Sequence, residues 1–273
     1  MNLSMTGEHA AKYTSGAQRA GKVTEAWGAD NFYCPNCSSP KLDWLKPNTK
    51  ANDYRCPNCG FWYQLKSQKT RIGSSITDGA YGAMMEAIRN DRTPNFFFLH
   101  YDLATWRVRN ILLVPSFAFP ESAIIRRKPL AVTARRAGWV GCNIALGRIP
   151  LEARIAVVTD NKAVSEREVC AQYKRVKPLK EIPVKQRGWT LDVLNIVRRL
   201  VEERRHAIRP AREDTRPTGE FTNEDVYAFE RELERLHPDN RHIKDKIRQQ
   251  LQVLRDAGLL EHSGKGVWRE SHR

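Results

Sequence analysis

The sequence predicts a two-part α/β protein: a domain with a mixed β-sheet and an embedded zinc site, followed by a C-terminal winged helix-turn-helix domain. In the first two thirds of the chain, apolar strand-like runs alternate with helical segments, which is typical of an α/β sheet. Two Cys-x-x-Cys pairs lie among these runs. Three further helical segments and a short β-ribbon close the chain, as in a winged helix. We place the two parts at residues 1–182 and 187–273.

The first part is expected to contain two helices, over 17–27 and 78–90, in which small and apolar residues gather on one side. Pro94 follows the second helix and ends that segment. Residues 174–186 turn to Lys, Pro and Val without a clear period, so we predict an interdomain linker there. Strands are predicted, in chain order, at 53–55, 61–67, 95–101, 108–114 and 154–159.

The second part is expected to contain three helices, at 189–203, 221–236 and 240–257. Residues 206–218 are rich in Arg and Pro and are predicted to form a flexible loop. Thr222 is a candidate N-cap because Asp225 follows three residues later. Gly258 ends the third helix, and 259–268 are predicted to form the wing. Four apolar residues recur at helical spacing and are expected in the core: Ile243, Ile247, Leu251 and Leu254.

Four of the six cysteines form the pattern Cys34-x2-Cys37-x18-Cys56-x2-Cys59. Two such knuckles supply four thiolates to one tetrahedral zinc ion. All four positions would be filled, so the zinc would be structural, with no open position for a substrate. Two pairs of unliganded thiols and an iron–sulfur cluster remain as alternatives.

The charge balance points to a polyanionic partner. The net charge is +15, and 27 basic residues face 15 acidic ones before Pro183, against 19 and 16 from there onward. The chain contains no apolar run of 18 residues and no apolar segment near its start, so we expect neither a membrane span nor a secretory signal, and a cytoplasmic location. The densest basic run consists of Arg126, Arg127, Lys128, Arg135, Arg136, Arg148 and Arg154.

One group of polar residues flanks the second cysteine pair. Asp53 precedes it, and Gln64 and Lys66 follow on one face of a predicted strand, with Tyr63 and Leu65 facing the core. A hairpin here would bring the three polar residues together. Phosphodiester hydrolysis needs such a group: oxygen ligands hold Mg²⁺, and an ammonium offsets the developing charge. Surface strands also carry such residues by chance, so this pattern alone does not establish a nuclease.

Several segments together make the chain resemble the family of DpnI-like methyl-directed type II (type IIM) restriction endonucleases, which cut GATC only when its adenine is methylated. The resemblance covers nearly the whole chain except the first residues and about 206–217. The matching segments are TEAW, YCPNC, LKS, DGAY, PNFFFL, RKPLA, TARRAGW, GCNI, RGWT, HIK and KIRQQLQVLRD. The resemblance implies a PD-(D/E)XK catalytic domain followed by a winged helix, and double-stranded DNA with 6-methyladenine in GATC as the partner.

The resemblance further implies that Asp53 and Lys66 are catalytic, that Mg²⁺ is the cofactor, and that position 64 should be Glu. Gln64 departs from this pattern. An amide oxygen can ligate a metal but brings no charge, so Mg²⁺ binding by Asp53 and Gln64 should be weaker. Glu25, on the preceding helix, is either a substitute carboxylate or a solvated surface residue.

DNA contacts are expected in both parts. Residues 133–139 are expected to form a DNA-facing loop, with Arg135 and Arg136 on phosphates or guanine. Trp139 either presses on the adenine methyl groups or belongs to the core. On the third helix and wing, the candidates for DNA contacts are Asn240, Arg241, His242, Lys244, Lys246, Arg248, Gln249, Lys265 and Arg269.

Three functions are weighed. The first is a monomeric, Mg²⁺-dependent endonuclease for methylated GATC. The second is a methyl-dependent DNA-binding protein whose nuclease site has decayed, with Gln64 as the trace of that loss. The third is a zinc-ribbon transcription regulator, which leaves Asp53, Lys66 and the basic loop without a role.

Overall fold

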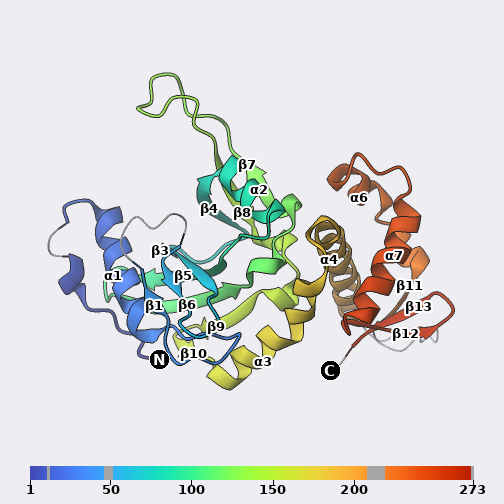
Figure 1. The fold of residues 1–273 in the computed structure, drawn as a ribbon, viewed down its shortest axis with the longest axis horizontal. Helices are drawn as coiled ribbons and strands as arrows, with labels where there is room; N and C mark the ends of the chain where they lie inside the picture. Colours follow the sequence, from blue (N-terminus) through green and yellow to red (C-terminus); the bar gives the residue numbers. More distant parts are fainter. Residues whose placement is uncertain (11–12, 46–51, 208–218, 272–273) are drawn as a thin grey trace.

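The computed structural model describes residues 1–273 except 11–12, 46–51, 208–218 and 272–273 (Figure 1). Its main sheet has seven strands in the order β1-β2-β3-β5-β6-β9-β10. Neighbouring strands are antiparallel except β3 and β5, which are parallel, so the predicted mixed α/β sheet is confirmed. The strands are β1 (Asp43–Trp44), β2 (Tyr54–Arg55), β3 (Trp62–Gln68), β5 (Asn95–Asp102), β6 (Arg107–Val114), β9 (Ile155–Thr159) and β10 (Lys162–Ala163).

Strand β5 separates two apolar layers. Phe97 and Leu99 face the larger core with helices α1 (Gly16–Asn31) and α3 (Glu166–Val176). Phe96 and Phe98 face a second core. Because both faces of β5 are covered, its sequence is apolar almost without interruption.

The second core lies beneath a small three-stranded sheet and helix α2 (Tyr81–Arg89). This sheet has the order β4-β8-β7. Its strands are β4 (Ser75–Ala80), β8 (Gly141–Ala145) and β7 (Ile124–Arg126). The first part of the chain is therefore layered, with helices on one face of the main sheet and the small sheet with α2 on the other.

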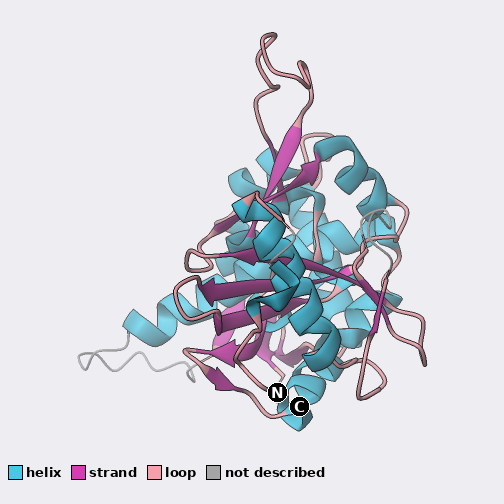
Figure 2. Ribbon diagram, turned by 90° about the vertical axis from the view of Figure 1, so that its left-hand side faces the viewer, coloured by secondary structure: helices cyan, strands magenta, loops and turns pink. Residues whose placement is uncertain are grey.

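A long arm, residues 127–140, connects β7 to β8 and projects from the molecule (Figures 1 and 2). Its stem is held by backbone hydrogen bonds: the N–H of Arg127 donates to the carbonyl of Gly141, and that of Leu130 to the carbonyl of Trp139. Val132, in its outer part, is 91% exposed. The arm therefore extends well outside both cores.

The C-terminal part is a winged helix, as predicted. Its three-stranded sheet has the order β11-β13-β12, and Figure 1 shows it packed beside α7. The four apolar residues predicted for the core of α7 are all buried. The elements are α4 (Val184–Ala207), β11 (Glu220–Thr222), α5 (Asn223–Tyr227), α6 (Glu230–Leu236), α7 (Ile243–Asp256), β12 (Leu260–Gly264) and β13 (Val267–Glu270).

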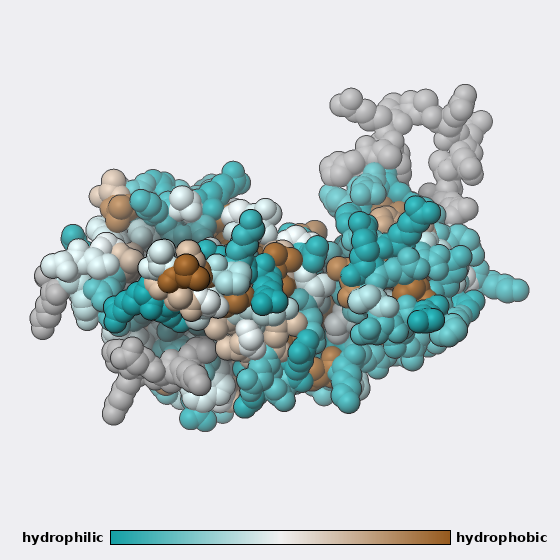
Figure 3. Space-filling view, turned by 90° about the horizontal axis from the view of Figure 1, so that it is seen from above, coloured by the Kyte–Doolittle hydropathy of each residue, from teal (hydrophilic) through white to brown (hydrophobic). Residues whose placement is uncertain are grey.

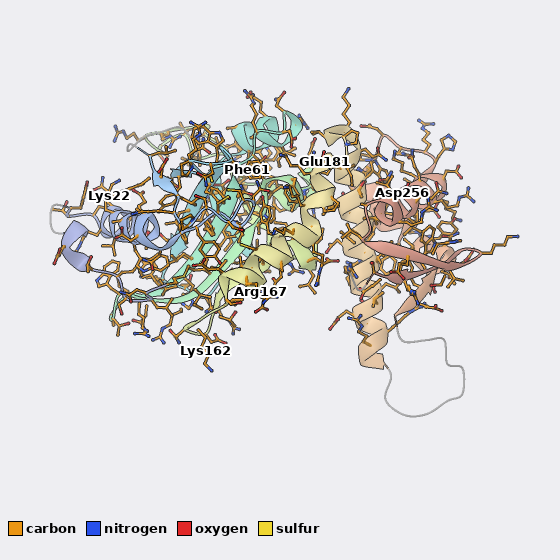
Figure 4. All side chains as sticks on the ribbon, turned by 60° about the horizontal axis from the view of Figure 1, so that its bottom comes forward. Lys22, Phe61, Lys162, Arg167, Glu181 and Asp256 are labelled. Carbon is orange, nitrogen blue, oxygen red and sulfur yellow. The ribbon has the colours of Figure 1, made fainter. Side chains whose placement is uncertain are left out.

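The predicted linker at 174–186 is wrong. These residues form the end of α3, a short 3-10 helix (Lys177–Glu181) and the first turn of α4. Val176, Leu179 and Ile182 are buried, so the segment is anchored although its sequence lacks a helical period. Figure 4 shows Glu181 between the main sheet and α4, with Asp256 on the far side of α4.

Helix α4 joins the two parts of the molecule. Thr190 donates a 2.7 Å hydrogen bond to the fully buried amide oxygen of Gln250 on α7. Asp192 accepts from the hydroxyl of Ser122 at 2.5 Å and pairs with Nε2 of His237 at 2.8 Å. Because residues of both parts belong to the larger core, α4 acts as a common spine.

Three other helix predictions need correction. Residues 78–80 of the predicted helix 78–90 belong to β4, because they pair with β8 across the small sheet. The helix predicted at 221–236 is divided: Phe221 pairs with Trp268 in the wing sheet, and Thr222 caps α5 through the predicted capping box with Asp225. The third helix begins at Ile243 rather than residue 240.

The remaining elements add little to the positions of the functional residues. Of the predicted loop 206–218, residues 208–218 lie outside the described residues, and residues 206–207 end α4. None of the described helices has the length and apolarity needed to cross a bilayer. The other 3-10 helices are Gly7–Ala10, Ser116–Ala118, Glu121–Ala123, Leu146–Arg148 and Leu151–Ala153.

Candidate nuclease site and nucleic-acid interface

The four predicted zinc ligands converge. The sulfur atoms of Cys34, Cys37, Cys56 and Cys59 all lie within 4.8 Å of one another. The Cys34–Cys59 and Cys37–Cys56 distances are 3.6 and 3.5 Å, near the separation of thiolates around one zinc ion with Zn–S bonds of about 2.3 Å. This four-cysteine cluster could therefore hold a zinc ion.

The two knuckles share one backbone design. After each Cys-x-x-Cys, the chain turns through a residue with positive φ, Ser38 at 57° and Gly60 at 75°. The N–H of that residue donates to the carbonyl of the first cysteine of its pair. A glycine adopts this left-handed conformation without strain, which explains Gly60 in the tight turn between β2 and β3.

The local environment shifts the pKa values of the cysteine thiols in different directions. Burial raises the pKa of Cys34 well above its usual value. Burial also opposes ionisation of Cys56, but hydrogen bonds from the backbone N–H groups of Cys59 and Asn58, together with those from the Cys37 and Cys59 side chains, lower the pKa of Cys56 to about 7. Backbone donors at a knuckle thus already favour a thiolate.

The hairpin of β2 and β3 brings Asp53 to Gln64, as predicted. The N–H of Asp53 donates to the carbonyl of Tyr63 at 2.9 Å, and the N–H of Leu65 donates to Oδ2 of Asp53 at 2.7 Å. Gln64 lies between these two strand partners, on the face opposite to the buried Tyr63. The carboxylate and the amide therefore border one small region of β3.

Asp53 is half-buried, and the partial loss of solvent raises the pKa of its carboxyl. The N–H of Leu65 and the positive charges of Lys66 and Lys22 lower the pKa, while the charge of Glu25 raises it. A desolvated carboxylate among several charges has the character of a cation ligand.

Lys66 follows two residues after Gln64 on the same face of β3. Its ammonium lies 2.5 Å from Oδ1 of Asp78. The side chain of Asp78 is only 6% exposed, and that of Lys66 is 24% exposed. The hairpin therefore places Lys66 beside Gln64, but its direct partner is a residue of β4 that was not singled out as a site residue.

Helix α1 forms the other border of this region. The hydroxyl of Tyr54 donates to the carbonyl of Glu25 at 2.7 Å, and the hydroxyls of Thr24 and Ser67 are 3.0 Å apart. The carboxylate of Glu25 pairs with Lys22 at 2.8 Å. The alternative carboxylate considered in the sequence is therefore near Asp53, but it already has a cationic partner.

The arm carries the predicted DNA-facing residues of the first part. Arg135 and Arg136 are exposed, and the guanidinium of Arg136 lies 4.6 Å from the centre of the Trp139 ring. Trp139 is half-buried and packs at the base of the arm, where its ring leaves no room for a Cβ on Gly141. Trp139 belongs to neither buried core, so the core alternative is not supported.

The predicted contacts of the winged helix divide into two groups. Asn240, Arg241 and His242 precede α7, and the side chain of Asn240 accepts from the N–H of His242 at 2.8 Å. They line a cleft of about 880 Å³ between the two parts of the molecule, together with Arg89 and Lys185.

The other group lies on α7 and the wing. Lys244 is 3.5 Å from Glu230, Arg248 pairs with Asp245, and Lys246 donates to Gln249 at 2.8 Å. Arg269 pairs with Glu261 at 2.6 Å, and Lys265 is exposed at the turn of the wing. The surface seen from the side of the arm is mainly hydrophilic (Figure 3).

Sequence reasoning missed Asp78 and Gln250. Asp78 lies within the DGAY segment, but the local pattern placed it at the start of a helix rather than on a strand beside Lys66. Gln250 has the spacing of a core residue on α7, and its polarity concealed its burial.

The comparison with protein families covers both parts of the chain. Residues 1–182 match the family model described as DpnI: Dam-replacing family. Residues 214–270 match the model described as DpnI_C: Dam-replacing HTH domain. The first match includes the cysteine cluster, the β2–β3 hairpin and the arm, and the second includes α5, α6, α7 and the wing.

Proposed function

Because this chain belongs to the Dam-replacing family, we propose that it is a restriction endonuclease that hydrolyses double-stranded DNA at adenine-methylated GATC sites with Mg²⁺. The proposal rests mainly on one observation: Asp53, Gln64 and Lys66 come together on a hairpin whose turn is part of a four-cysteine cluster. The cluster would hold one structural Zn²⁺ and fix the hairpin.

The donor set at the hairpin suits Mg²⁺, which prefers oxygen ligands. Asp53 offers a half-buried carboxylate whose Oδ2 is oriented by the N–H of Leu65, and Gln64 offers an amide oxygen. When bound, Mg²⁺ would polarise the scissile phosphate and acidify the attacking water. Lys66 would place its ammonium where negative charge develops on the phosphate.

In the proposed complex the two parts both contact the methylated sequence. Arg135 and Arg136 on the arm would hold phosphates or guanine, and Trp139 would supply apolar surface to the adenine methyl groups. The segment 240–248 and Lys265 would form the second protein surface that contacts the DNA. We propose that a monomer suffices for this arrangement.

A second function is favoured by one specific residue. Gln64 brings no negative charge to the cation, so a methyl-dependent DNA-binding protein without cleavage is the alternative. In that case the arm and the winged helix would act as proposed, while the hairpin would be inert.

Digestion of fully methylated, hemimethylated and unmethylated GATC duplexes with Mg²⁺ distinguishes the two functions. Cleavage restricted to methylated duplexes, and lost in Lys66→Ala, supports the endonuclease. A mobility shift on methylated DNA without any cleavage supports the alternative. Equal cleavage by the wild type and Lys66→Ala would reject the site assignment.

A further test concerns the methyl preference. Trp139→Ala should reduce the ratio of affinities for methylated and unmethylated duplexes, because an apolar contact to the methyl groups is lost. Binding measured by fluorescence anisotropy gives this ratio, and an unchanged ratio would exclude Trp139 from methyl recognition.

A further inference from the structure

We propose that Asp78 is a positioning residue of the nuclease site, which holds the ammonium of Lys66 and ties it to the small sheet that carries the arm. This inference rests on the proposed endonuclease function and assigns to that site a residue from outside the hairpin. The contact that supports it is the 2.5 Å ion pair between Nζ of Lys66 and Oδ1 of Asp78.

The burial of this pair makes it unlike an exposed surface ion pair. The Asp78 side chain is 6% exposed and the Lys66 side chain is 24% exposed, so solvent screens their attraction only in part. Among the described residues of the first part, every other ion pair except that of Glu152 with Arg198 has at least one side chain that is more exposed than Lys66. Asp78 is therefore well placed to fix a lysine.

A lysine needs such a partner if its ammonium is to act at one point. Its side chain has four rotatable bonds, and fixing them costs conformational entropy. A displacement of about 1 Å at a reacting centre can reduce a rate about a hundredfold. The carboxylate of Asp78 restricts Lys66 before DNA arrives, so less ordering remains to be done in the complex.

The position of Asp78 also connects the site to the arm. Asp78 pairs with Cys142 on β8, and the register shifts between Asp78 and Ala80. The pKa of the buried Cys142 thiol is raised to about 11, mainly by burial; the charge of Asp78 adds to the rise and the charge of Lys66 opposes it. Lys66, Asp78 and Cys142 therefore form one compact group.

The next residue on β8 is Gly141, which closes the base of the arm. Its carbonyl accepts from the N–H of Arg127, and the Trp139 ring fills the space that a Cβ at this position would need. The charge of Arg127 also lowers the pKa of Cys142. The residue that orients Lys66 thus stands on the strand next to the root of the proposed methyl-reading arm.

The test uses Asp78→Asn, which preserves shape and removes the charge, and Asp102→Asn as a matched control. Asp102 also forms a 2.5 Å ion pair, with Arg109, but at the far end of β5. Single-turnover cleavage, affinity for methylated duplex, and acetylation of Lys66 followed by mass spectrometry are measured on the full chain.

For Asp78→Asn we expect cleavage about 10- to 100-fold slower, affinity within about twofold of the wild type, and acetylation of Lys66 several-fold faster. Asp102→Asn should match the wild type in all three. Asp78→Glu, which keeps the charge, should recover part of the cleavage rate. A purely structural role would lower affinity and rate together and would not be rescued by charge.

The proposal is overturned if Asp78→Asn cleaves at the wild-type rate, or if Lys66 is acetylated no faster in the variant. Should the wild type not cleave at all, the endonuclease function fails, and the acetylation of Lys66 alone decides whether Asp78 holds it. Should Asp78→Asn not fold, the same three measurements on Asp78→Glu decide. The longer side chain moves the carboxylate relative to Lys66, so both the rate of DNA cleavage and the rate of Lys66 acetylation should differ from those of the wild type.

Discussion

In the proposed nuclease site, Gln64 would set how much negative charge the hairpin offers to a divalent cation. The residue lies on β3 across from Asp53, at the position where the resemblance leads us to expect a carboxylate. An amide oxygen preserves the geometry of a ligand but removes half of the charge of the pair. Gln64 should therefore control how strongly the cleavage rate depends on the Mg²⁺ concentration.

Gln64→Glu is expected to lower the Mg²⁺ concentration needed for half-maximal cleavage by roughly tenfold, because a second carboxylate joins Asp53. Titration of Mg²⁺ in a plasmid-cutting assay measures the effect, with Gln68→Glu, farther along β3, as control. Complete loss of cleavage in Gln64→Glu would mean that the site is adapted to the amide.

Asp53 should impose a pH dependence. Burial raises the pKa of its carboxyl in the folded chain, so the ionised form lowers the free energy of unfolding above that pKa. As the pH falls through the folded pKa toward the unfolded value, the penalty disappears. Protons also compete with Mg²⁺ for this carboxylate over the same range, so cleavage should need more Mg²⁺ at low pH.

Asp53→Asn is therefore expected to raise the Tm of the metal-free protein by a few degrees at pH 7, because it removes a desolvated charge and keeps the bond from Leu65. The difference should vanish near pH 4, and cleavage should be abolished at every pH. Calorimetry at the two pH values checks the stability; a lower Tm at pH 7 would contradict the argument.

Among the elements, the β2–β3 hairpin depends most on an external support. Strand β2 has only two residues, and it pairs with β3 at two positions, Tyr54 with Tyr63 and Arg55 with Trp62; so short a ladder is marginally stable by itself in water. The cysteine cluster joins its turn to the first knuckle, so metal binding and the geometry of Asp53 and Gln64 should be coupled.

Cys56→Ser is expected to lose zinc and to lower the free energy of unfolding by on the order of 5 kcal/mol or more, since the cluster contributes to folding. The wild type should contain one zinc per chain by elemental analysis. Cys170→Ser, a buried cysteine outside the cluster, should retain the metal. Full zinc content in Cys56→Ser would exclude a four-thiolate site.

Helix α4 is the second element whose contacts predict a measurable effect on stability. Asp192, 3% exposed, joins Ser122 of the first part to His237 of the second. The aromatic ring of His237 also stacks on Trp189 with a centroid distance of 3.8 Å.

Asp192→Ala should destabilise the protein by roughly 2–4 kcal/mol, because it leaves two half-buried polar partners, Ser122 and His237, without their acceptor. Chemical denaturation measures this loss. Asp239→Ala removes an exposed carboxylate from the same region and should change stability by less than about 0.5 kcal/mol. Similar losses in the free energy of unfolding for the two variants would contradict the role of α4 in joining the two parts.

Local patterns predicted the elements whose determinants are close in sequence. The cysteine spacing predicted the cluster, and alternation along β3 predicted which side of the strand carries Gln64 and Lys66. The partner of Lys66 was missed because Asp78 becomes a strand residue only by pairing with Cys142, far along the chain. The segment 174–186 was misjudged for a related reason: its apolar residues are buried by tertiary contacts that no local period reveals.

On the scale of the whole molecule, charge should dominate DNA affinity. The net charge is +15, and each phosphate that a basic residue neutralises releases condensed counterions. The logarithm of the affinity should therefore fall linearly with the logarithm of the salt concentration.

The double variant Arg135→Ala/Arg136→Ala should reduce this slope by about 2, because two phosphate contacts are lost. Arg167→Ala, an exposed arginine on α3 (Figure 4), should leave the slope unchanged. Anisotropy titrations between low and high salt provide the slopes, and equal slopes for the two variants would remove the arm from the interface.

The spine formed by α4 has a consequence for the length of DNA that the protein prefers. Because Thr190, Asp192 and their partners are fixed in one continuous core, the arm and helix α7 stay at a constant separation. A flexible tether would let affinity grow smoothly as a duplex is lengthened. A rigid connection fixes the duplex length that both surfaces need. Below a threshold number of base pairs, only the arm or the winged helix can bind. Above it, the other surface binds at high effective concentration, so affinity rises in a single step.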